Sequence, residues 1–259
     1  MTTIGVIQAR FDSSRLPGKV LEHVGATTML AGVMRRLSES RLVDEVVVAT
    51  TTSPTDDGIA ALVANEGYEV VRGSSFDVLD RFHDVLLARP DADVVVRVTA
   101  DCPFLDPELV DEVIRARAEH GVDFASNRLP PPYARTYPVG LDVEVSTSAA
   151  LRRAWSEADE PYFREHVMPF LYVEDSQFSR FIVDLDADYS QYRWTVDTPE
   201  DLRAARAIAR YLPHSSTSWR DVLAVVVEHP ELVAINAQFT QKQVTQVDSR
   251  WTEIDRKRD

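Results

Sequence analysis

Three cations stand close together in residues 10–19, which read Arg-Phe-Asp-Ser-Ser-Arg-Leu-Pro-Gly-Lys. Arg10 and Arg15 can each donate forked hydrogen bonds to phosphate oxygens, and Lys19 adds a compact point charge on a flexible stem. Small residues between them would let backbone N–H groups approach an anion: Ser13, Ser14 and Gly18. We interpret the segment as a polyphosphate-binding loop, the alternative being a solvated basic loop. It matches neither a Walker A loop nor a Gly-x-Gly-x-x-Gly turn, which disfavours a kinase and a dehydrogenase.

The run before this loop, residues 4–9, is almost continuously apolar and predicts a buried parallel strand. The loop would then leave the sheet at the carboxyl end of that strand. Open α/β sheets bind their ligands at this end. The placement of the three cations therefore favours the polyphosphate interpretation over the solvated loop.

Two carboxylates occupy comparable places further along the chain. Asp101 follows the Val-rich run 93–98, and Pro103 closes the short turn behind it. An aspartate at this edge suits Mg²⁺, which takes one or two carboxylates together with substrate phosphates. The alternative role is to cap the next helix, although Asp106 is better placed for that. Asp197 could complete the metal site or could cap a helix beside Thr198, and its position does not decide between the two.

A second group of polar residues could contact another substrate. Asp142 and Glu144 are two positions apart on an expected strand and so share a face, which either reaches toward substrate hydroxyls or the metal or is simply solvated. Arg164 could bind an acidic group, and His166 could relay a proton or have a structural role. The other histidines are scattered without ligand spacing, which argues against a transition-metal site.

The acidic balance of the chain excludes some partners. Lys and Arg number 28 against 42 Asp and Glu, a net charge of −14, whereas nucleic acid or an anionic membrane would require a basic surface. The single cysteine, Cys102, excludes an internal disulfide and a cysteine-rich zinc site. No apolar run reaches the roughly 20 residues that span a bilayer. We expect a cytoplasmic protein without nucleic-acid or membrane partners.

Strand-like and helix-like segments alternate over the first half, which is typical of βαβ units and a mostly parallel sheet. The expected strands lie at 4–9, 44–50, 69–72 and 93–98, and the helices at 27–38, 56–66, 77–88 and 107–118. Beyond them we expect a loop over the site at 127–140 containing Pro130–Pro132, a strand at 141–145, helices at 147–157 and 161–171, a strand at 178–184, a strand ending near Trp194, and helices at 199–211 and 218–228. These form one domain over residues 1–235, with an acceptor-side insertion at 127–185 that could also mediate dimerisation, and a polar tail at 236–259.

Several motifs follow one another from residue 4 to about 210 and carry a family resemblance. They are Ile-Gln-Ala-Arg-Phe-Asp-Ser-Ser-Arg-Leu-Pro-Gly-Lys at 7–19, Val-Val-Ala-Thr-Thr at 47–51, Arg-Gly-Ser at 72–74, Asp-Val-Leu-Asp-Arg at 77–81, Arg-Val-Thr-Ala-Asp-Cys-Pro at 97–103, Thr-Tyr-Pro-Val-Gly-Leu-Asp-Val-Glu at 136–144, Arg-Glu-His-Val at 164–167 and Arg-Trp-Thr-Val-Asp-Thr-Pro-Glu-Asp at 193–201. With this set the chain resembles the cytidylyltransferases related to CMP-sugar synthetases, and most closely the spore-coat-polysaccharide, SpsF-type branch.

The resemblance implies a Rossmann-like, three-layer α/β nucleotidyltransferase fold of the nucleotide-diphospho-sugar transferase type, with a mostly parallel central sheet. It also implies that CTP is joined to a small acidic acceptor with release of pyrophosphate, that Mg²⁺ is the cofactor, and that the enzyme is a homodimer. Arg10, Lys19 and Asp101 would be catalytic, and Asp101 with Asp197 would hold the metal. Nucleotide contacts would come from Ala9, Arg10, Ser13, Ser14, Arg15, Lys19, Thr50, Thr51, Arg72, Gly73, Ser74, Asp77 and Thr99. Acceptor contacts would come from Tyr137, Asp142, Glu144, Arg164 and His166.

Two other functions remain as alternatives. A glycosyltransferase that uses a nucleotide-sugar donor shares the nucleotide-binding sheet and a metal aspartate. The triply cationic loop argues against it, because a diphosphate-sugar has no γ-phosphate to hold. A nucleotide-sensing module without turnover is the other alternative, and the intact set of Arg10, Lys19, Asp101 and Asp197 disfavours it.

Overall fold

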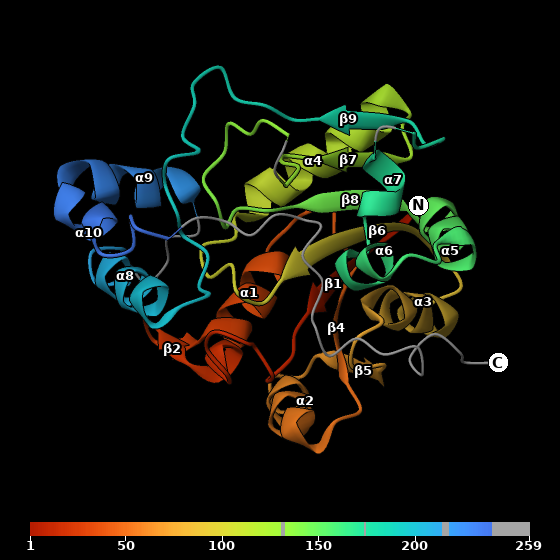
Figure 1. Cartoon of the computed structure of the whole chain (residues 1–259), viewed down its shortest axis with the longest axis horizontal. Helices are drawn as coiled ribbons and strands as arrows, with labels where there is room; N and C mark the ends of the chain where they lie inside the picture. Colours follow the sequence, from red (N-terminus) through yellow and green to blue (C-terminus); the bar gives the residue numbers. More distant parts are fainter. Residues whose placement is uncertain (131–132, 174, 214–217, 240–259) are drawn as a thin grey trace.

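A seven-stranded sheet forms the centre of the molecule in the computed structural model, which describes residues 1–130, 133–173, 175–213 and 218–239. The strand order is β5-β4-β1-β6-β8-β7-β9. The strands are β1 (Thr2–Gln8), β4 (Glu45–Thr51), β5 (Glu69–Gly73), β6 (Ala92–Thr99), β7 (Phe124–Ser126), β8 (Glu144–Thr147) and β9 (Arg180–Ile182). Only β8 runs against its neighbours in this sheet. The predicted mostly parallel sheet is confirmed (Figure 1).

Helices cover both faces of the sheet (Figure 1). They are α1 (Met29–Ser38), α2 (Asp57–Asn65), α3 (Val78–Ala88), α4 (Pro107–His120), α5 (Ser148–Glu157), α6 (Pro161–His166), α7 (Pro169–Tyr172), α8 (Pro199–Ala209), α9 (Trp219–Glu228) and α10 (Pro230–Ala234). Shorter elements are the 3₁₀ turns η1 (Lys19–Leu21) and η2 (Pro54–Asp56) and the hairpin β2 (His23–Val24) and β3 (Thr27–Thr28).

Alternation along the strands divides the apolar residues between two cores. In β6, Val94, Val96 and Val98 pack with α1, α2, α4, α8 and α9, whereas Val95 packs with α3, α5 and α7. Successive strand residues point to opposite faces, so a continuously apolar strand supplies both layers of helices. This arrangement confirms the three-layer α/β fold.

The structure differs from the predicted elements in several places. The strand expected at 141–145 begins only at Glu144, and the strand expected to end near Trp194 is reduced to a single bridge between Val139 and Arg193. The helix expected at 161–171 is divided into α6 and α7. The short elements β7 and α10 were not predicted, because three to five residues carry too little periodicity to be recognised. Within the proposed tail, Asn236 is buried. Residues 240–259 of that tail, and Pro131, Pro132 and His214, lie outside the described residues.

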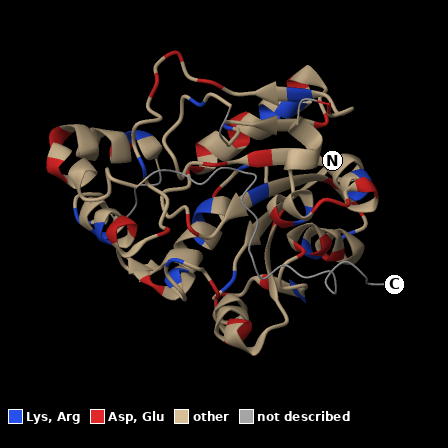
Figure 2. Ribbon diagram, viewed as in Figure 1, with Lys and Arg blue, Asp and Glu red and all other residues tan. Residues whose placement is uncertain are grey.

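Acidic residues occur on helices all around the molecule (Figure 2), in line with the net charge of −14. Among the described residues, no helix combines the length and the apolar character needed to cross a membrane.

Candidate functional site

A cavity of about 250 Å³ opens at the carboxyl ends of β1 and β6. Ten predicted site residues line it: Ala9, Arg10, Ser13, Ser14, Arg15, Lys19, Thr99, Asp101, His166 and Asp197. Five further residues complete the lining: Gln8, Val20, Val78, Ala100 and Glu165. The cationic loop, the two carboxylates and one end of α6 therefore meet in one place, although they are far apart in the sequence.

Hydrogen bonds to a buried carboxylate shape the cationic loop. Asp56 accepts from the backbone N–H of Phe11 at 2.7 Å and from the hydroxyls of Thr50 and Thr51 at 3.0 and 2.6 Å. Gly18 lies at φ 74°, and a Cβ there would come within 2.8 Å of the Phe11 ring, so this turn needs glycine. Thr50 and Thr51, predicted as nucleotide contacts, thus hold the loop in place through Asp56.

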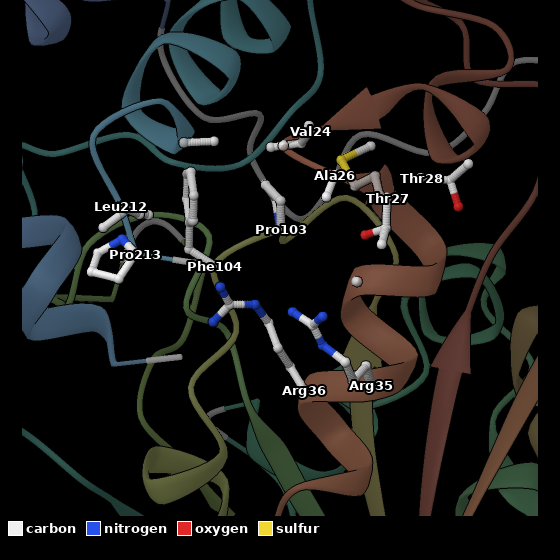
Figure 3. Close-up of a pocket in the computed structure, with 14 residues that line it drawn as sticks. Val24, Ala26, Thr27, Thr28, Arg35, Arg36, Pro103, Phe104, Leu212 and Pro213 are labelled. Carbon is white, nitrogen blue, oxygen red and sulfur yellow. The ribbon is translucent and has the colours of Figure 1, made fainter. Parts of the chain in front are cut away.

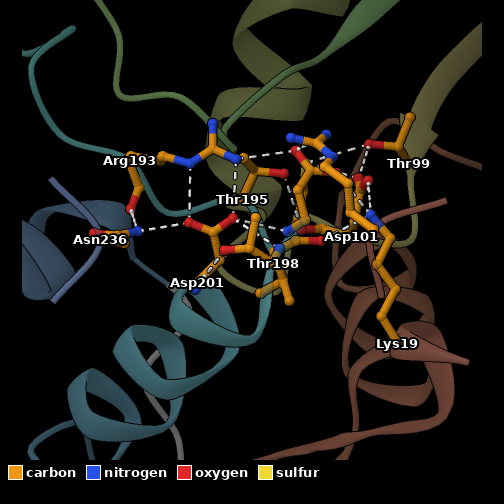
Figure 4. A network of polar contacts seen from close by, with 12 residues as sticks. Lys19, Thr99, Asp101, Arg193, Thr195, Thr198, Asp201 and Asn236 are labelled. Atoms are coloured by element: carbon orange, nitrogen blue, oxygen red, sulfur yellow. Dashed lines mark hydrogen bonds and ion pairs between the residues drawn. The ribbon is translucent and has the colours of Figure 1, made fainter. Parts of the chain in front are cut away.

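The Lys19 ammonium bridges the two predicted metal ligands (Figure 4). Its Nζ lies 2.7 Å from Asp101 Oδ2 and 2.9 Å from Asp197 Oδ1, and it donates to the Val196 carbonyl at 2.8 Å. Burial alone would lower the pKa of Lys19, but the two carboxylates outweigh it, and the pKa is raised above its ordinary value. Lys19 is therefore a permanent cation at the bottom of the cavity.

Asp101 is available to the site because a different aspartate caps α4. Asp106 accepts from the N–H groups of Glu108 and Leu109 at 2.7 and 3.3 Å, as the sequence analysis expected. Asp101 instead receives the Thr99 hydroxyl at 2.6 Å and the Lys19 ammonium. Burial would raise the pKa of Asp101, but Lys19 and Thr99 outweigh it and the pKa lies below its ordinary value, so the carboxylate is ionised at neutral pH.

Asp197 is held by three cations and does not cap α8. Besides Lys19, Arg15 approaches its Oδ2 at 2.9 Å and Arg193 at 3.0 Å. The cap of α8 is Thr198, in a capping box with Asp201. Asp197 was expected either to complete a metal site or to cap a helix, and these contacts exclude the capping role.

Asp197 is connected to a buried polar network of Arg193, Asp201 and Asn236 (Figure 4). Arg193 forms a two-pronged ion pair with Asp201, with both distances 2.9 Å. The side chain of Asn236 donates to Asp201 at 2.9 Å and to the Arg193 carbonyl at 3.1 Å. None of these three was predicted as a site residue. Arg193 and Asp201 stood within a family motif, whereas Asn236 carried no signal because it is a single polar residue in a polar segment.

The oxygen atoms at the bottom of the cavity suit a hard divalent cation. Asp101 and Asp197 already face a shared cationic position, since both bind the same ammonium. Mg²⁺ takes oxygen ligands and often binds through one or two carboxylates plus water and substrate phosphates. Among the described residues, no group of three or more His, Cys, Asp or Glu is placed to hold a metal. Two carboxylates leave the other ligand positions of Mg²⁺ to water and phosphate oxygens, so Asp101 and Asp197 fit a Mg²⁺ ion that binds together with a polyphosphate.

His166, which was predicted to contact the acceptor, lies at the cavity next to a strained turn. Val167 has φ 71° and ψ −63°, and the N–H of Met168 donates to the His166 carbonyl at 2.9 Å. This is a γ-turn with positive φ, which is rare and strained for a β-branched residue. The turn ends α6 and leaves Glu165 and His166 at the cavity wall.

The remaining predicted acceptor residues contact the protein itself. Arg164 binds Asp77 at 2.6 and 2.8 Å and the carbonyls of Trp155 and Ala158. Asp142 pairs with two arginines, Arg128 at 3.0 Å and Arg135 at 2.6 Å. Glu144 pairs with Arg97, and Tyr137 packs on Trp219 with ring centroids 5.8 Å apart. None of Tyr137, Asp142, Glu144 and Arg164 lines the cavity described above.

The predicted nucleotide residues on β5 and before α3 also have structural partners. Arg72 donates to the carbonyls of Thr51 and Ser53 and pairs with Asp57 at 2.7 Å. Ser74 accepts from the N–H of Asp77 at 3.1 Å, and Asp77 caps α3. Burial raises the pKa of Asp77 although Arg164 counteracts it. Gly73 is required by close approach, since a Cβ there would lie 2.9 Å from Arg81 Cγ.

A second cavity, of about 160 Å³, lies beside Pro103 and Phe104 (Figure 3). Pro103 and Phe104 form one wall, and the side chains of Arg35 and Arg36 form another. Arg36 donates to the Leu105 carbonyl at 3.1 Å. None of the predicted site residues lines this cavity, so we place the active site at the first one.

Comparison with known proteins identifies a family. A family model described as cytidylyltransferase matches residues 4–217. The spore coat polysaccharide biosynthesis protein SpsF of Bacillus subtilis is 35% identical over 212 residues, 78% of this chain and 84% of that protein. The 3-deoxy-manno-octulosonate cytidylyltransferase of Myxococcus xanthus is 42% identical over 107 residues, 40% of this chain and 42% of that protein. A solved cytidylyltransferase structure from Leptospira borgpetersenii superposes with a TM-score of 0.84 at 31% identity, covering 94% of this chain and all of that one.

Proposed function

The chain belongs to the cytidylyltransferase family and is a nucleotidyltransferase, and we propose that it transfers CMP from CTP to an acidic sugar or to another phosphorylated, carboxylated or phosphonate acceptor. Pyrophosphate is the second product. The observation that carries this proposal is the contact of Lys19 with Asp101 and Asp197, because it joins the cationic loop to two carboxylates inside one cavity. The family match favours this reaction over a nucleotide-sugar-dependent glycosyl transfer.

In the proposed reaction, an acceptor oxygen attacks the α-phosphorus of CTP in line with the bond to pyrophosphate. A phosphorus–oxygen bond forms to the acceptor, and the bond to the bridging oxygen breaks with its electron pair leaving on pyrophosphate. Negative charge grows on the leaving group, where Arg10, Arg15 and Lys19 would stabilise it. Bound Mg²⁺ would supply further charge neutralisation on the phosphates next to Asp101 and Asp197.

The ion pairs of the loop fit this role, because they keep the cations at the cavity before a polyphosphate arrives. Lys19 and Arg15 are oriented by Asp101 and Asp197, and the Arg193–Asp201 pair orients Asp197 in turn. Cations fixed in advance need little reorganisation when charge develops in the transition state. The buried network is therefore part of the proposed phosphate site.

The acceptor side of the cavity carries Glu165 and His166. An acceptor that attacks through a carboxylate, phosphate or phosphonate is already ionised and needs no base. A sugar hydroxyl must lose a proton, and Glu165 or His166 would accept it. The name of the Myxococcus xanthus relative contains a carboxylated sugar, and that of the Bacillus subtilis relative contains spore coat polysaccharide, which supports an acidic acceptor in surface polysaccharide or related small-molecule synthesis.

The test measures pyrophosphate release from CTP and Mg²⁺ with a panel of acidic sugars, phosphorylated acids and phosphonates. A thermal-shift screen of nucleoside triphosphates precedes it, because a ligand of the folded state raises the melting temperature. Asp101→Asn should abolish metal-dependent turnover without unfolding the protein. Asp91→Asn is the matched control, since this exposed aspartate precedes the opposite end of β6. Tight binding of a UDP-sugar with no affinity for CTP would refute the proposal.

A further inference from the structure

The second cavity, of about 160 Å³, is a positively charged place in an acidic molecule. Arg35 and Arg36 both line it, and their side chains leave α1 toward Pro103 and Phe104 (Figure 3). Among the described residues, no Asp or Glu lines this cavity. In the main cavity, by contrast, the cations of the loop pair with carboxylates that also line it. The second cavity therefore attracts an anion from outside the chain.

The two arginines are neighbours in the sequence, and their charges repel each other. Arg36 is buried and donates to the Leu105 carbonyl at 3.1 Å. Burial lowers the pKa of Arg36 below its ordinary value, and the charge of Arg35 lowers it further, while Glu39 and Asp106 oppose the shift only in part. Arg35 is half exposed, and its pair with Glu39, at 3.7 Å, is a surface ion pair of little strength. An anion in the cavity would therefore stabilise both guanidinium groups.

The other walls of the cavity are largely apolar. Phe104 forms one of them, and Leu212 and Pro213 approach from the segment that follows α8 (Figure 3). Gly32 lies within α1, where a glycine destabilises a helix relative to alanine. A Cβ at Gly32 would come within 3.4 Å of Thr27 Oγ1, so a longer side chain there would enter the cavity. The cavity thus combines two cations with space beside an apolar surface, as small-molecule sites do.

This cavity is close to the active site but separate from it. Pro103 and Phe104 belong to the turn that begins at Asp101, and Phe104 packs edge-on against Trp194 with ring centroids 6.5 Å apart. The lining residues of the two cavities nevertheless do not overlap. A molecule in the second cavity would leave the positions of the cationic loop open.

We propose that the second cavity binds a small organic anion, a compact molecule with a phosphate or carboxylate group and an apolar portion. Arg35 and Arg36 would bind the oxygens of the acidic group through forked, charge-assisted hydrogen bonds. The apolar portion would pack against Phe104 and Leu212. The site goes beyond the proposed transfer reaction and does not depend on it.

The test titrates the protein with phenyl phosphate and with benzoate and follows binding by NMR of the probe. Arg36→Met removes the buried guanidinium, and Gly32→Leu fills the cavity while both arginines stay. We expect each variant to raise the Kd of the probe by about 10-fold or more, as for loss of a hydrogen bond to a charged group. Leucine is a better helix former than glycine, so Gly32→Leu should keep or raise the melting temperature. The probe that binds more tightly shows whether the site prefers a phosphate ester or a carboxylate.

Two control variants locate the bound probe. Arg41→Met removes an exposed arginine just beyond α1, and Arg15→Met removes a cation of the main cavity. Both should bind the probe like the unchanged protein. Failure of the unchanged protein to bind either probe, or an unchanged Kd in Gly32→Leu, overturns the inference. So does loss of binding in Arg15→Met, because the probe would then lie in the main cavity, and so does inorganic phosphate binding as tightly as phenyl phosphate.

Discussion

Replacing Lys19 by methionine tests whether the ion pairs at the bottom of the cavity serve both stability and turnover. The Lys19 side chain is only 8% exposed, and its loss leaves Asp101 without its cation and facing Asp197. Asp197 keeps Arg15 and Arg193. Removing one member of a buried pair costs about 3 to 5 kcal/mol, and we expect the lower value because both aspartates retain some exposure. For a chain of this size, that lowers the melting temperature by roughly 6 to 12 °C.

In the proposed reaction, the same substitution would also remove a cation from the leaving pyrophosphate. Loss of one such stabilising group lowers kcat by about 100- to 1,000-fold. Stability is measured by denaturant unfolding, and turnover by pyrophosphate release at saturating CTP. A Lys19→Met protein that keeps both its stability and its turnover would refute the whole interpretation of this residue.

The double variant Lys19→Met with Asp101→Asn separates the two effects. Neutralising Asp101 removes the unpaired buried charge, so the double variant should lose about 1 to 2 kcal/mol less than the sum of the single variants. It should remain as inactive as the single variants, because no cation returns to the leaving group. Recovery of turnover together with stability would show that Lys19 acts only through the fold.

Three further predictions concern the surrounding network. Asn236→Ala should lower the free energy of unfolding by about 1 to 2 kcal/mol, since it leaves buried acceptors on Asp201 and Arg193 with fewer donors; unchanged unfolding in urea would mean that this contact contributes nothing. Stability should fall below about pH 4, because three partly or fully buried carboxylates have folded-state pKa values under the unfolded 3.8: Asp101, Asp142 and Asp201. The stability that they contribute is present above that pH and is lost as they protonate. A flat unfolding midpoint between pH 5 and 3 would contradict this. If Arg164 contacts the acceptor, Arg164→Ala should raise the KM for the acceptor more than the KM for CTP. Similar changes in both KM values, together with a lower melting temperature, would show that Arg164 serves only to pair with Asp77.

The sheet, and the meeting of the cationic loop with Asp101, could be predicted because they depend on local patterns. Runs such as residues 93–98 are apolar at nearly every position, and only a strand covered on both faces needs that pattern. The carboxyl ends of parallel strands meet at one edge, so the loop after β1 and Asp101 after β6 had to be neighbours. Lys19 and Asp101 are 82 positions apart and yet form an ion pair for this reason.

The acceptor side could not be predicted in the same way, because the partner of a buried charge is decided by packing. Arg164, Asp142 and Glu144 were singled out as substrate contacts by residue type and spacing. In the structure each meets a protein charge of opposite sign: Asp77, Arg128 with Arg135, and Arg97. Residue type shows that a buried charge needs a partner, but the sequence does not say whether the partner is a substrate or a side chain.

The two sides of the cavity favour different acceptors for an electrostatic reason. In the proposed reaction the cationic loop would receive the triphosphate, whereas Glu165 is an acidic residue on the side where the acceptor would enter. An acceptor that attacks through a carboxylate would approach Glu165 with like charge, and this repulsion has to be offset by the cations of the loop or by His166. A hydroxyl acceptor meets no such repulsion and gains a base. Glu165→Gln therefore distinguishes the two: turnover with a carboxylate nucleophile should be maintained or rise, and turnover with a hydroxyl nucleophile should fall if Glu165 is its base.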